Sequence, residues 1–95
     1  MGKLKQSAYR VVVHGRVQGV GFRYNAQKKA LSLGLTGWVR NCGDGTVEAY
    51  FEGVPERTSA FLKWLHRGPL GANVHRVDKH SVSPQDCYKT FNITY

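Results

Sequence analysis

The sequence lacks the features that mark membrane proteins, secreted disulfide-rich proteins and zinc proteins. No apolar run approaches the roughly 18 residues needed to span a bilayer, and the charged residues 1–6 are not followed by the apolar core of a signal peptide. Cys42 and Cys87 are the only cysteines, without the density of a disulfide framework or the spacing of a zinc site. We therefore expect a soluble, cytoplasmic protein with two free thiols.

Two nucleotide-binding patterns and a metal site are also absent from the sequence. The dinucleotide fingerprint requires a glycine where Tyr24 stands, and the P-loop requires a glycine followed by lysine and then serine or threonine. Nor does the expected layout place a serine or cysteine beside a histidine as a nucleophile and its base. The histidines are spread over three expected elements, with no pair at helical ligand spacing; they are His14, His66, His75 and His80.

Acidic residues are few, with 6 carboxylates against 14 lysines and arginines and a net charge of +8. Residues 1–50 hold 8 of the basic and 2 of the acidic residues, so most of the excess lies in the half that contains a glycine-rich loop. Such a field favours anionic ligands, although it also fits solubility or loose attraction to nucleic acid. The 95 residues, 41% of them hydrophobic, predict one globular domain over residues 1–95, with residues 1–6 disordered.

The glycine loop lies between a strand-like and a helix-like run, and it reads Gly-Arg-Val-Gln-Gly-Val-Gly-Phe-Arg over residues 15–23. Glycines let main-chain N–H groups turn toward a ligand, the start of a helix adds partial positive charge, and arginine adds a planar set of donors. The combination predicts a cradle for a small phosphorylated group. The alternative is a structural turn, which glycines often mark.

Apolar periodicity predicts the order strand, helix, strand, strand, helix, strand, with a short terminal strand. The expected strands cover residues 8–14, 36–41, 46–52, 74–83 and 91–95; one helix runs from Phe22 to a stop at Gly34 and the other from Pro55 to a stop at Gly68-Pro69. This order fits a split βαβ arrangement, an antiparallel sheet with two helices on one face. Right-handed crossovers make the first two strands run the same way, so the glycine loop and Arg40-Asn41 should lie at one edge of the sheet.

Arg23 and Asn41 are the candidate catalytic residues at that edge. The Arg23 guanidinium would bind an anion and stabilise charge without transferring a proton. The Asn41 amide would orient a water, although asparagine at a strand end is also a common turn former. A site without a general base suits a mixed carboxylic-phosphoric anhydride, whose carboxylate leaves unprotonated and whose phosphate oxygens take the proton from water. Thr46 is either a donor near this site or an ordinary strand-edge residue.

Residues 14–23 (HGRVQGVGFR) and 34–41 (GLTGWVRN) resemble the two signature regions of the acylphosphatases. The resemblance continues through residues 44–48 (DGTVE) and Glu52-Gly53 and covers the chain from about residue 8 to its end. Asn25 and Cys42 depart from the residues more familiar at these positions. Residues 75–83 are less strand-like than in typical members, which leaves the limits of the fourth strand open.

The resemblance implies a ferredoxin-like α/β sandwich, of the α+β class, that hydrolyses acyl phosphates to a carboxylate and orthophosphate with neither metal nor organic cofactor. It implies that Arg23 binds the phosphate and that Asn41 orients the attacking water. The expected partner is a small-molecule acyl phosphate, and we expect a monomer that binds neither nucleic acid nor membrane. The phosphate-binding residues would be Arg16, Val17, Gln18, Gly19, Val20, Gly21, Phe22 and Arg23.

Two other functions fit the same topology. An RNA-recognition module needs aromatic residues on adjacent central strands, whereas Tyr50 and Phe51 are consecutive and should face opposite sides of the sheet. A non-catalytic anion sensor would share the loop without turning over a substrate, and a further alternative is the acylphosphatase-like module of a large carbamoyl-transfer protein. Hydrolysis of benzoyl phosphate separates the enzyme from both.

Overall fold

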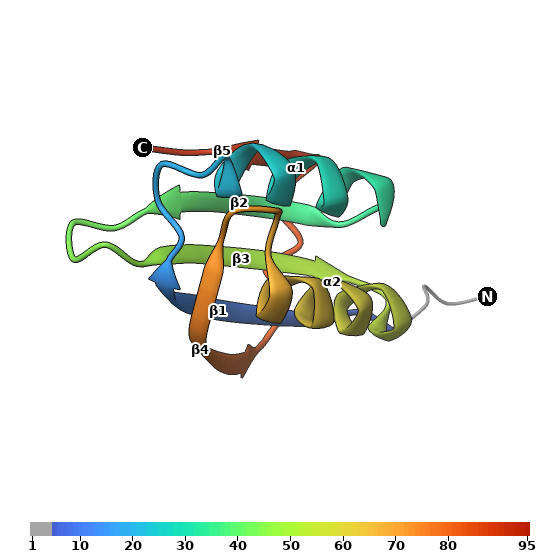
Figure 1. Ribbon diagram of the computed structural model, residues 1–95. Coiled ribbons are helices and arrows are strands. Elements are labelled where there is room, and N and C mark those ends of the chain that lie inside the picture. Colours follow the sequence, from blue (N-terminus) through green and yellow to red (C-terminus); the bar gives the residue numbers. More distant parts are fainter. Residues whose placement is uncertain (1–4) are drawn as a thin grey trace.

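The computed structural model describes residues 5–95, which form one sheet with two helices on it (Figure 1). The strands are β1 (Ser7–Arg16), β2 (Thr36–Asn41), β3 (Val47–Gly53), β4 (Asn73–Val82) and β5 (Phe91–Ile93), and the helices are α1 (Phe22–Ser32) and α2 (Pro55–Arg67). The chain order β1-α1-β2-β3-α2-β4-β5 confirms the predicted α+β arrangement. Of residues 1–6, which the sequence predicts to be disordered, residues 1–4 lie outside the described residues.

The sheet has the strand order β4-β1-β3-β2-β5. Its first four strands pair antiparallel as expected, whereas β5 pairs parallel with β2, which makes the sheet mixed. The difference arises because the chain leaves β4 at one edge of the sheet and reaches the opposite edge before β5 begins. There β5 runs in the direction of β2 and places residues 91–93 beside residues 37–39.

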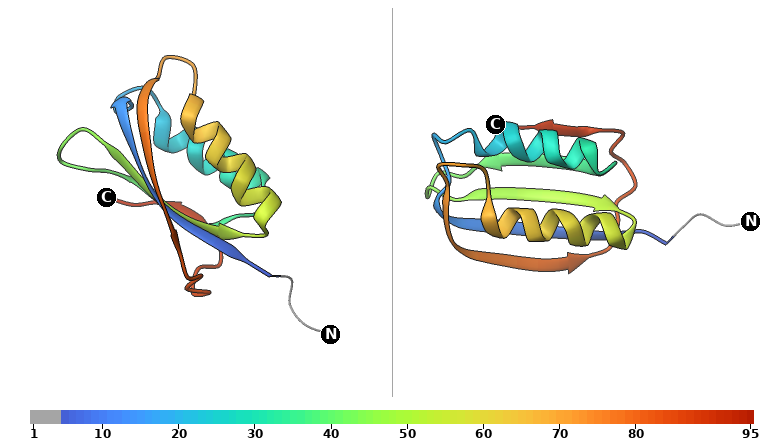
Figure 2. Two further views of the ribbon diagram at one scale, coloured as in Figure 1. Left: turned by 90° about the horizontal axis from the view of Figure 1, so that it is seen from below. Right: turned by 45° about the vertical axis from the view of Figure 1, so that its right-hand side comes forward.

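Both helices cover the same face of the sheet and bury the core against it (Figure 2). The central strand β3 is buried along its whole length, and its Phe51 ring lies 4.8 Å from the Phe61 ring of α2. Burial of these large rings contributes a major part of the stability, since the favourable free energy grows with the apolar area removed from water. The residues that α1 and α2 bury stand at the predicted helical spacing: Phe22, Ala26, Ala30, Thr58, Phe61, Leu62 and Leu65.

The face of the sheet away from the helices carries an aromatic and charged layer. Tyr50 stacks on Trp38, its partner on β2, with ring centroids 6.4 Å apart, and Tyr88 covers it at 5.4 Å. Glu48, also on β3, forms ion pairs with Arg40 at 2.7 Å and with Arg10 at 3.5 Å. Consecutive residues of a strand point to opposite faces, and the structure confirms this for Tyr50 and Phe51.

The limits of β1 and β4 differ from those expected because the two strands pair along almost their whole length. β1 continues through Gly15 to Arg16, with a register shift between His14 and Gly15 that keeps the strand paired with β4. β4 is an edge strand with most of its residues at least partly exposed, so its sequence need not alternate strictly between apolar and polar residues. This position explains why residues 75–83 look less strand-like than the other strands.

Candidate functional site

The glycine loop and the end of β2 meet at one edge of the sheet (Figure 1). β1 and β2 are both antiparallel to β3, so both strands end at this edge, as the sequence predicts. A pocket of about 170 Å³ opens between them. The pocket is lined by Val17, Gly19, Gly21, Phe22, Arg23, Tyr24, Asn41, Ile93 and Tyr95.

The conformation of the loop leaves its main-chain donors available. Gly19 and Gly21 have φ of 75° and 74°, in the left-handed region that glycine adopts without a steric penalty, and Gly21 caps α1. Within residues 5–95, no hydrogen bond is donated by the main-chain N–H groups of residues 18–22. Free N–H groups at the start of a helix, where the dipole adds positive charge, form an environment suited to an oxyanion.

The side chain of Gln18 fastens the loop to the turn between β2 and β3. Its Nε2 donates to the carbonyl oxygens of Cys42, at 2.8 Å, and of Thr46, at 3.0 Å. Since Cys42 follows Asn41 directly, these bonds connect the loop to the other candidate catalytic residue. Two hydrogen bonds from one amide limit how far the loop can move from the end of β2.

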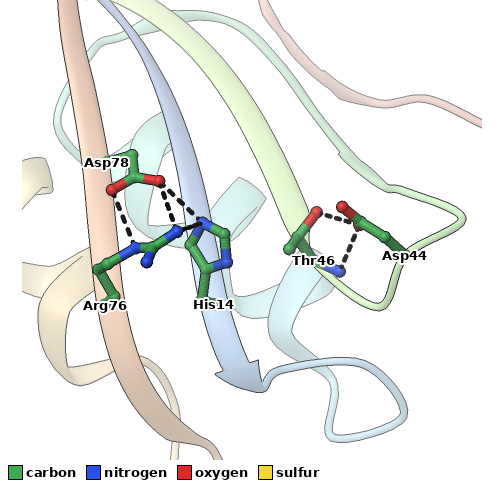
Figure 3. A network of polar contacts seen from close by, with 5 residues as sticks. All are labelled: His14, Asp44, Thr46, Arg76 and Asp78. Atoms are coloured by element: carbon green, nitrogen blue, oxygen red, sulfur yellow. Dashed lines mark hydrogen bonds and ion pairs between the residues drawn. The ribbon is translucent and has the colours of Figure 1, made fainter.

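The same turn is held by Asp44 and Thr46 (Figure 3). The hydroxyl of Thr46 donates to Oδ1 of Asp44 at 2.6 Å, and the Thr46 N–H donates to the same oxygen at 3.1 Å. These hydrogen bonds lower the pKa of Asp44 below its ordinary value. Of the two interpretations of Thr46, its hydroxyl contact therefore supports a structural role in the turn.

Arg23 is half-buried in the first turn of α1, and its Cζ lies 5.2 Å from the centroid of the Tyr95 ring. The ion pairs within residues 5–95 do not include Arg23. The negative face of the ring attracts the guanidinium, and at this exposed position the attraction is modest. Arg23 thus presents a charge that no described carboxylate neutralises.

Asn41 ends β2 at the pocket, where its Oδ1 atom is buried and accepts no hydrogen bond from any described residue. A buried acceptor without a donor is costly, so such an atom in a native structure calls for a physical explanation. A small donor that enters the pocket would satisfy it. Water is the simplest molecule of that kind.

Six of the predicted site residues line the pocket, and three do not. Val17, Gly19, Gly21, Phe22, Arg23 and Asn41 line it, whereas Arg16 is exposed at the end of β1, Val20 packs against the core, and Gln18 braces the loop. Sequence reasoning missed Tyr24, Ile93 and Tyr95 as lining residues. Tyr24 was detectable as the neighbour of Arg23, but nothing local places β5 beside β2.

A second polar cluster lies on the face of the sheet away from the helices (Figure 3). Nε2 of His14 and Oδ2 of Asp78 are 2.9 Å apart, and Arg76 Nε lies 3.1 Å from Asp78 Oδ1. The contact with His14, followed by the charge of Arg76, lowers the pKa of Asp78. Neither this cluster nor any other within residues 5–95 gathers three His, Cys, Asp or Glu side chains that would hold a metal ion. Cys42 and Cys87 are free thiols.

None of the helices within residues 5–95 has the length and apolar character needed to cross a membrane.

Comparison with known proteins gives the same family by sequence and by structure. The family model for acylphosphatase matches residues 9–93 of the chain. An acylphosphatase from Nocardioides sp. is 55% identical over 80 residues, which are 84% of this chain and 81% of that protein. The crystal structure of acylphosphatase from Bacillus subtilis matches with a TM-score of 0.90 at 36% identity and covers 94% of this chain and 99% of that one. The crystal structure of HypF from T. kodakarensis matches with a TM-score of 0.81 at 34% identity, and the matched part covers 94% of this chain and 12% of that one.

Proposed function

The chain belongs to the acylphosphatase family and hydrolyses acyl phosphates, and from this premise we propose that the reaction takes place in the pocket between the glycine loop and Asn41. One observation carries the proposal: free main-chain N–H groups, an arginine without an ion pair and a buried amide oxygen without a donor meet in one pocket. Each of these groups matches one part of the hydrolysis.

The N–H groups of the loop and the guanidinium of Arg23 bind the phosphoryl group. Charge on its non-bridging oxygens is spread over several donors, which suits phosphoryl transfer because catalysis there consists mainly of positioning and electrostatic stabilisation. Gln18 keeps the loop at the distance from β2 that this arrangement requires. The guanidinium lies against Tyr95, which lines the same pocket.

Asn41 orients the attacking water. Its Oδ1 accepts a hydrogen bond from the water, which satisfies the buried acceptor and directs the water oxygen toward phosphorus. An amide titrates neither as an acid nor as a base, so its contribution is orientation and not proton transfer.

The chemistry balances without a titrating side chain. The water oxygen bonds to phosphorus, the bond between phosphorus and the acyl oxygen breaks, and its electron pair leaves with the carboxylate. One proton of the water passes to a phosphate oxygen of the substrate, and the products are a carboxylate and orthophosphate. Because a carboxylate leaves without protonation, no general acid is required, and we propose a reaction independent of metal ions and organic cofactors.

Benzoyl phosphate hydrolysis tests this function. We expect Arg23→Ala and Asn41→Ala to abolish turnover, and only Arg23→Ala also to lose the binding of orthophosphate, measured directly by calorimetry. The matched controls are Arg67→Ala, on the exposed side of α2, and Asn92→Ala, exposed on β5, which should retain activity. Excess EDTA should leave the native rate unchanged. Turnover that persists in both Arg23→Ala and Asn41→Ala would place the chemistry elsewhere.

The alternatives differ from this proposal in measurable ways. A non-catalytic anion-binding module would bind orthophosphate but would not release benzoate. An RNA-binding sheet needs accessible rings, whereas Tyr50 is 2% exposed beneath Tyr88. If titration with single-stranded RNA shows no binding to the protein, the result agrees with the enzyme and not with an RNA-binding module.

We further propose that the protein acts as a cytoplasmic monomer. Its two free thiols suit a reducing compartment. Four large apolar residues are exposed among those described, and the two that lie together, Tyr24 and Tyr95, line the pocket of about 170 Å³ and do not extend to the other two, Leu31 and Leu70. Cell fractionation and sedimentation would test both statements.

A further inference from the structure

Three residues of the pocket are not among the groups that we assign to contact the phosphate directly. They are Tyr24, which follows Arg23 on α1, Ile93 on β5, and Tyr95 just beyond that strand. All three bring apolar surface to a pocket whose other members are loop glycines, Arg23, Asn41 and the two buried side chains Val17 and Phe22. The pocket therefore combines polar groups with two tyrosine rings.

The exposure of the two tyrosines is unusual for this chain. Only four large hydrophobic residues among residues 5–95 are exposed, and two of them, Tyr24 at 63% and Tyr95 at 95%, belong to this one pocket. The other two, Leu31 and Leu70, do not line it. Aromatic rings held open to solvent beside a site of chemistry indicate a surface that a ligand covers.

The geometry of an acyl phosphate indicates which part of the ligand covers these rings. Its phosphoryl end is held by the loop, and the acyl group is attached to phosphorus through a single bridging oxygen. With the phosphate among the N–H groups, the acyl group has to leave the cradle on its open side, and the exposed rings are the lining residues free to cover it. One face of the Tyr95 ring lies under the Arg23 guanidinium, and its high exposure leaves the rest of the ring open.

We propose that Tyr24, Ile93 and Tyr95 form the acyl subsite of the enzyme, and that it favours acyl phosphates with planar aromatic or extended apolar acyl groups over those with a small acyl group. This inference rests on the proposed function, since it takes the phosphate to lie between the loop and Arg23. Stacking between two rings adds favourable energy beyond area burial, so each ring should be worth roughly three- to tenfold in kcat/KM for an aromatic substrate.

The test compares benzoyl phosphate with acetyl phosphate in the same variants. The measured quantity is the ratio of kcat/KM for benzoyl phosphate to that for acetyl phosphate, divided by the wild-type ratio, which cancels the intrinsic reactivity of the two substrates. We expect this ratio to fall roughly three- to tenfold in Tyr24→Ala and in Tyr95→Ala. Tyr24→Phe, which keeps the ring, should restore it.

Leu31→Ala is the matched control, because it removes an exposed apolar side chain from the same helix two turns beyond Tyr24 and outside the pocket. It should leave the ratio at the wild-type value. The inhibition constant of orthophosphate provides a second readout, and in Tyr24→Ala it should stay close to wild type, which shows that the phosphate end is intact. In Tyr95→Ala the inhibition constant of orthophosphate should rise, since the Arg23 guanidinium loses the Tyr95 ring that it lies against.

The outcomes separate the two claims. A ratio unchanged in both Tyr24→Ala and Tyr95→Ala, while Arg23→Ala abolishes turnover of both substrates, would overturn the acyl subsite alone. A ratio that falls equally in Leu31→Ala would overturn it too. Turnover of both substrates by Arg23→Ala would instead overturn the proposed phosphate site, whatever the ratio.

Discussion

The side-chain amide of Gln18 donates to the carbonyl oxygen of Cys42 at 2.8 Å, across 24 residues of sequence. With a second hydrogen bond to Thr46, it joins the loop that holds the phosphate to the turn that follows Asn41. The two halves of the proposed site are thus held together by one side chain and not only by the strands that carry them.

Removal of this brace should affect both stability and activity. In Gln18→Ala the Cys42 and Thr46 carbonyl oxygens each lose one hydrogen bond but keep one from a main-chain N–H, and for two lost hydrogen bonds we expect a loss of about 1–3 kcal/mol in the free energy of unfolding, measured in urea. A looser loop should lower kcat/KM by at least about tenfold, since positioning dominates this chemistry. The control is Gln27→Ala, which removes one hydrogen bond to the Phe91 carbonyl oxygen. This variant should lose stability but keep the affinity of the protein for orthophosphate. Equal activity losses in the two variants would contradict the special role of Gln18.

A second prediction concerns the stability of a variant at Gly19, whose backbone is in the left-handed conformation. A Cβ at this position meets no neighbouring atom within 4 Å, so the cost of Gly19→Ala comes from its φ of +75° and amounts to about 1–2 kcal/mol of unfolding free energy. Gly43→Ala is the matched control, because Gly43 also has open space around it but no positive φ. Urea unfolding should show destabilisation in the first variant only. A similar loss in Gly43→Ala would mean that the loop backbone is not the cause.

Acid stability should depend on Asp78. The contact with His14 and the charge of Arg76 hold the pKa of this carboxylate below its unfolded value of about 4. Its contribution is therefore fully present above that value and is lost as pH falls through the lower, folded-state pKa. Unfolding free energies measured between neutral and strongly acid pH should decline less steeply for Asp78→Asn than for the wild type. An identical decline in both proteins would show that this contact does not contribute.

Alkaline stability should depend on Tyr50. Burial, together with the hydrogen bond from its hydroxyl to Glu52 at 2.6 Å, raises the pKa of Tyr50 to about 12. The unfolded chain releases this proton near pH 10, so folding stability falls as pH rises from about 10 to 12. Ultraviolet titration should show one tyrosine that ionises late or only on unfolding, and Tyr50→Phe should lack it. Ionisation of every tyrosine near pH 10 in the folded protein would refute the prediction.

Much of the fold is predictable because its causes are local. The helical spacing of Phe22, Ala26 and Ala30, and the Asp-Gly turn at residues 44–45, depend on residues within one or two turns of each other. Even the meeting of the glycine loop with Asn41 follows from the element order, since right-handed crossovers leave few layouts. The limits of β4 are harder to predict because it is an edge strand that is largely exposed, with only part of one face, including Val74 and Val77, packed against the core, so its sequence is less constrained.

Local patterns in the sequence predict the element types, the helix-covered sheet, the glycine loop, and the common edge for Arg23 and Asn41. Three features become visible only in the folded chain: β5 lies parallel to β2 and brings Ile93 and Tyr95 into the pocket, Gln18 reaches Cys42 and Thr46, and His14 meets Asp78. The physical reason is distance along the chain. Local propensities depend on near neighbours, whereas the choice of sheet edge for a terminal strand depends on the packing energy of the whole core, which no short stretch of sequence contains.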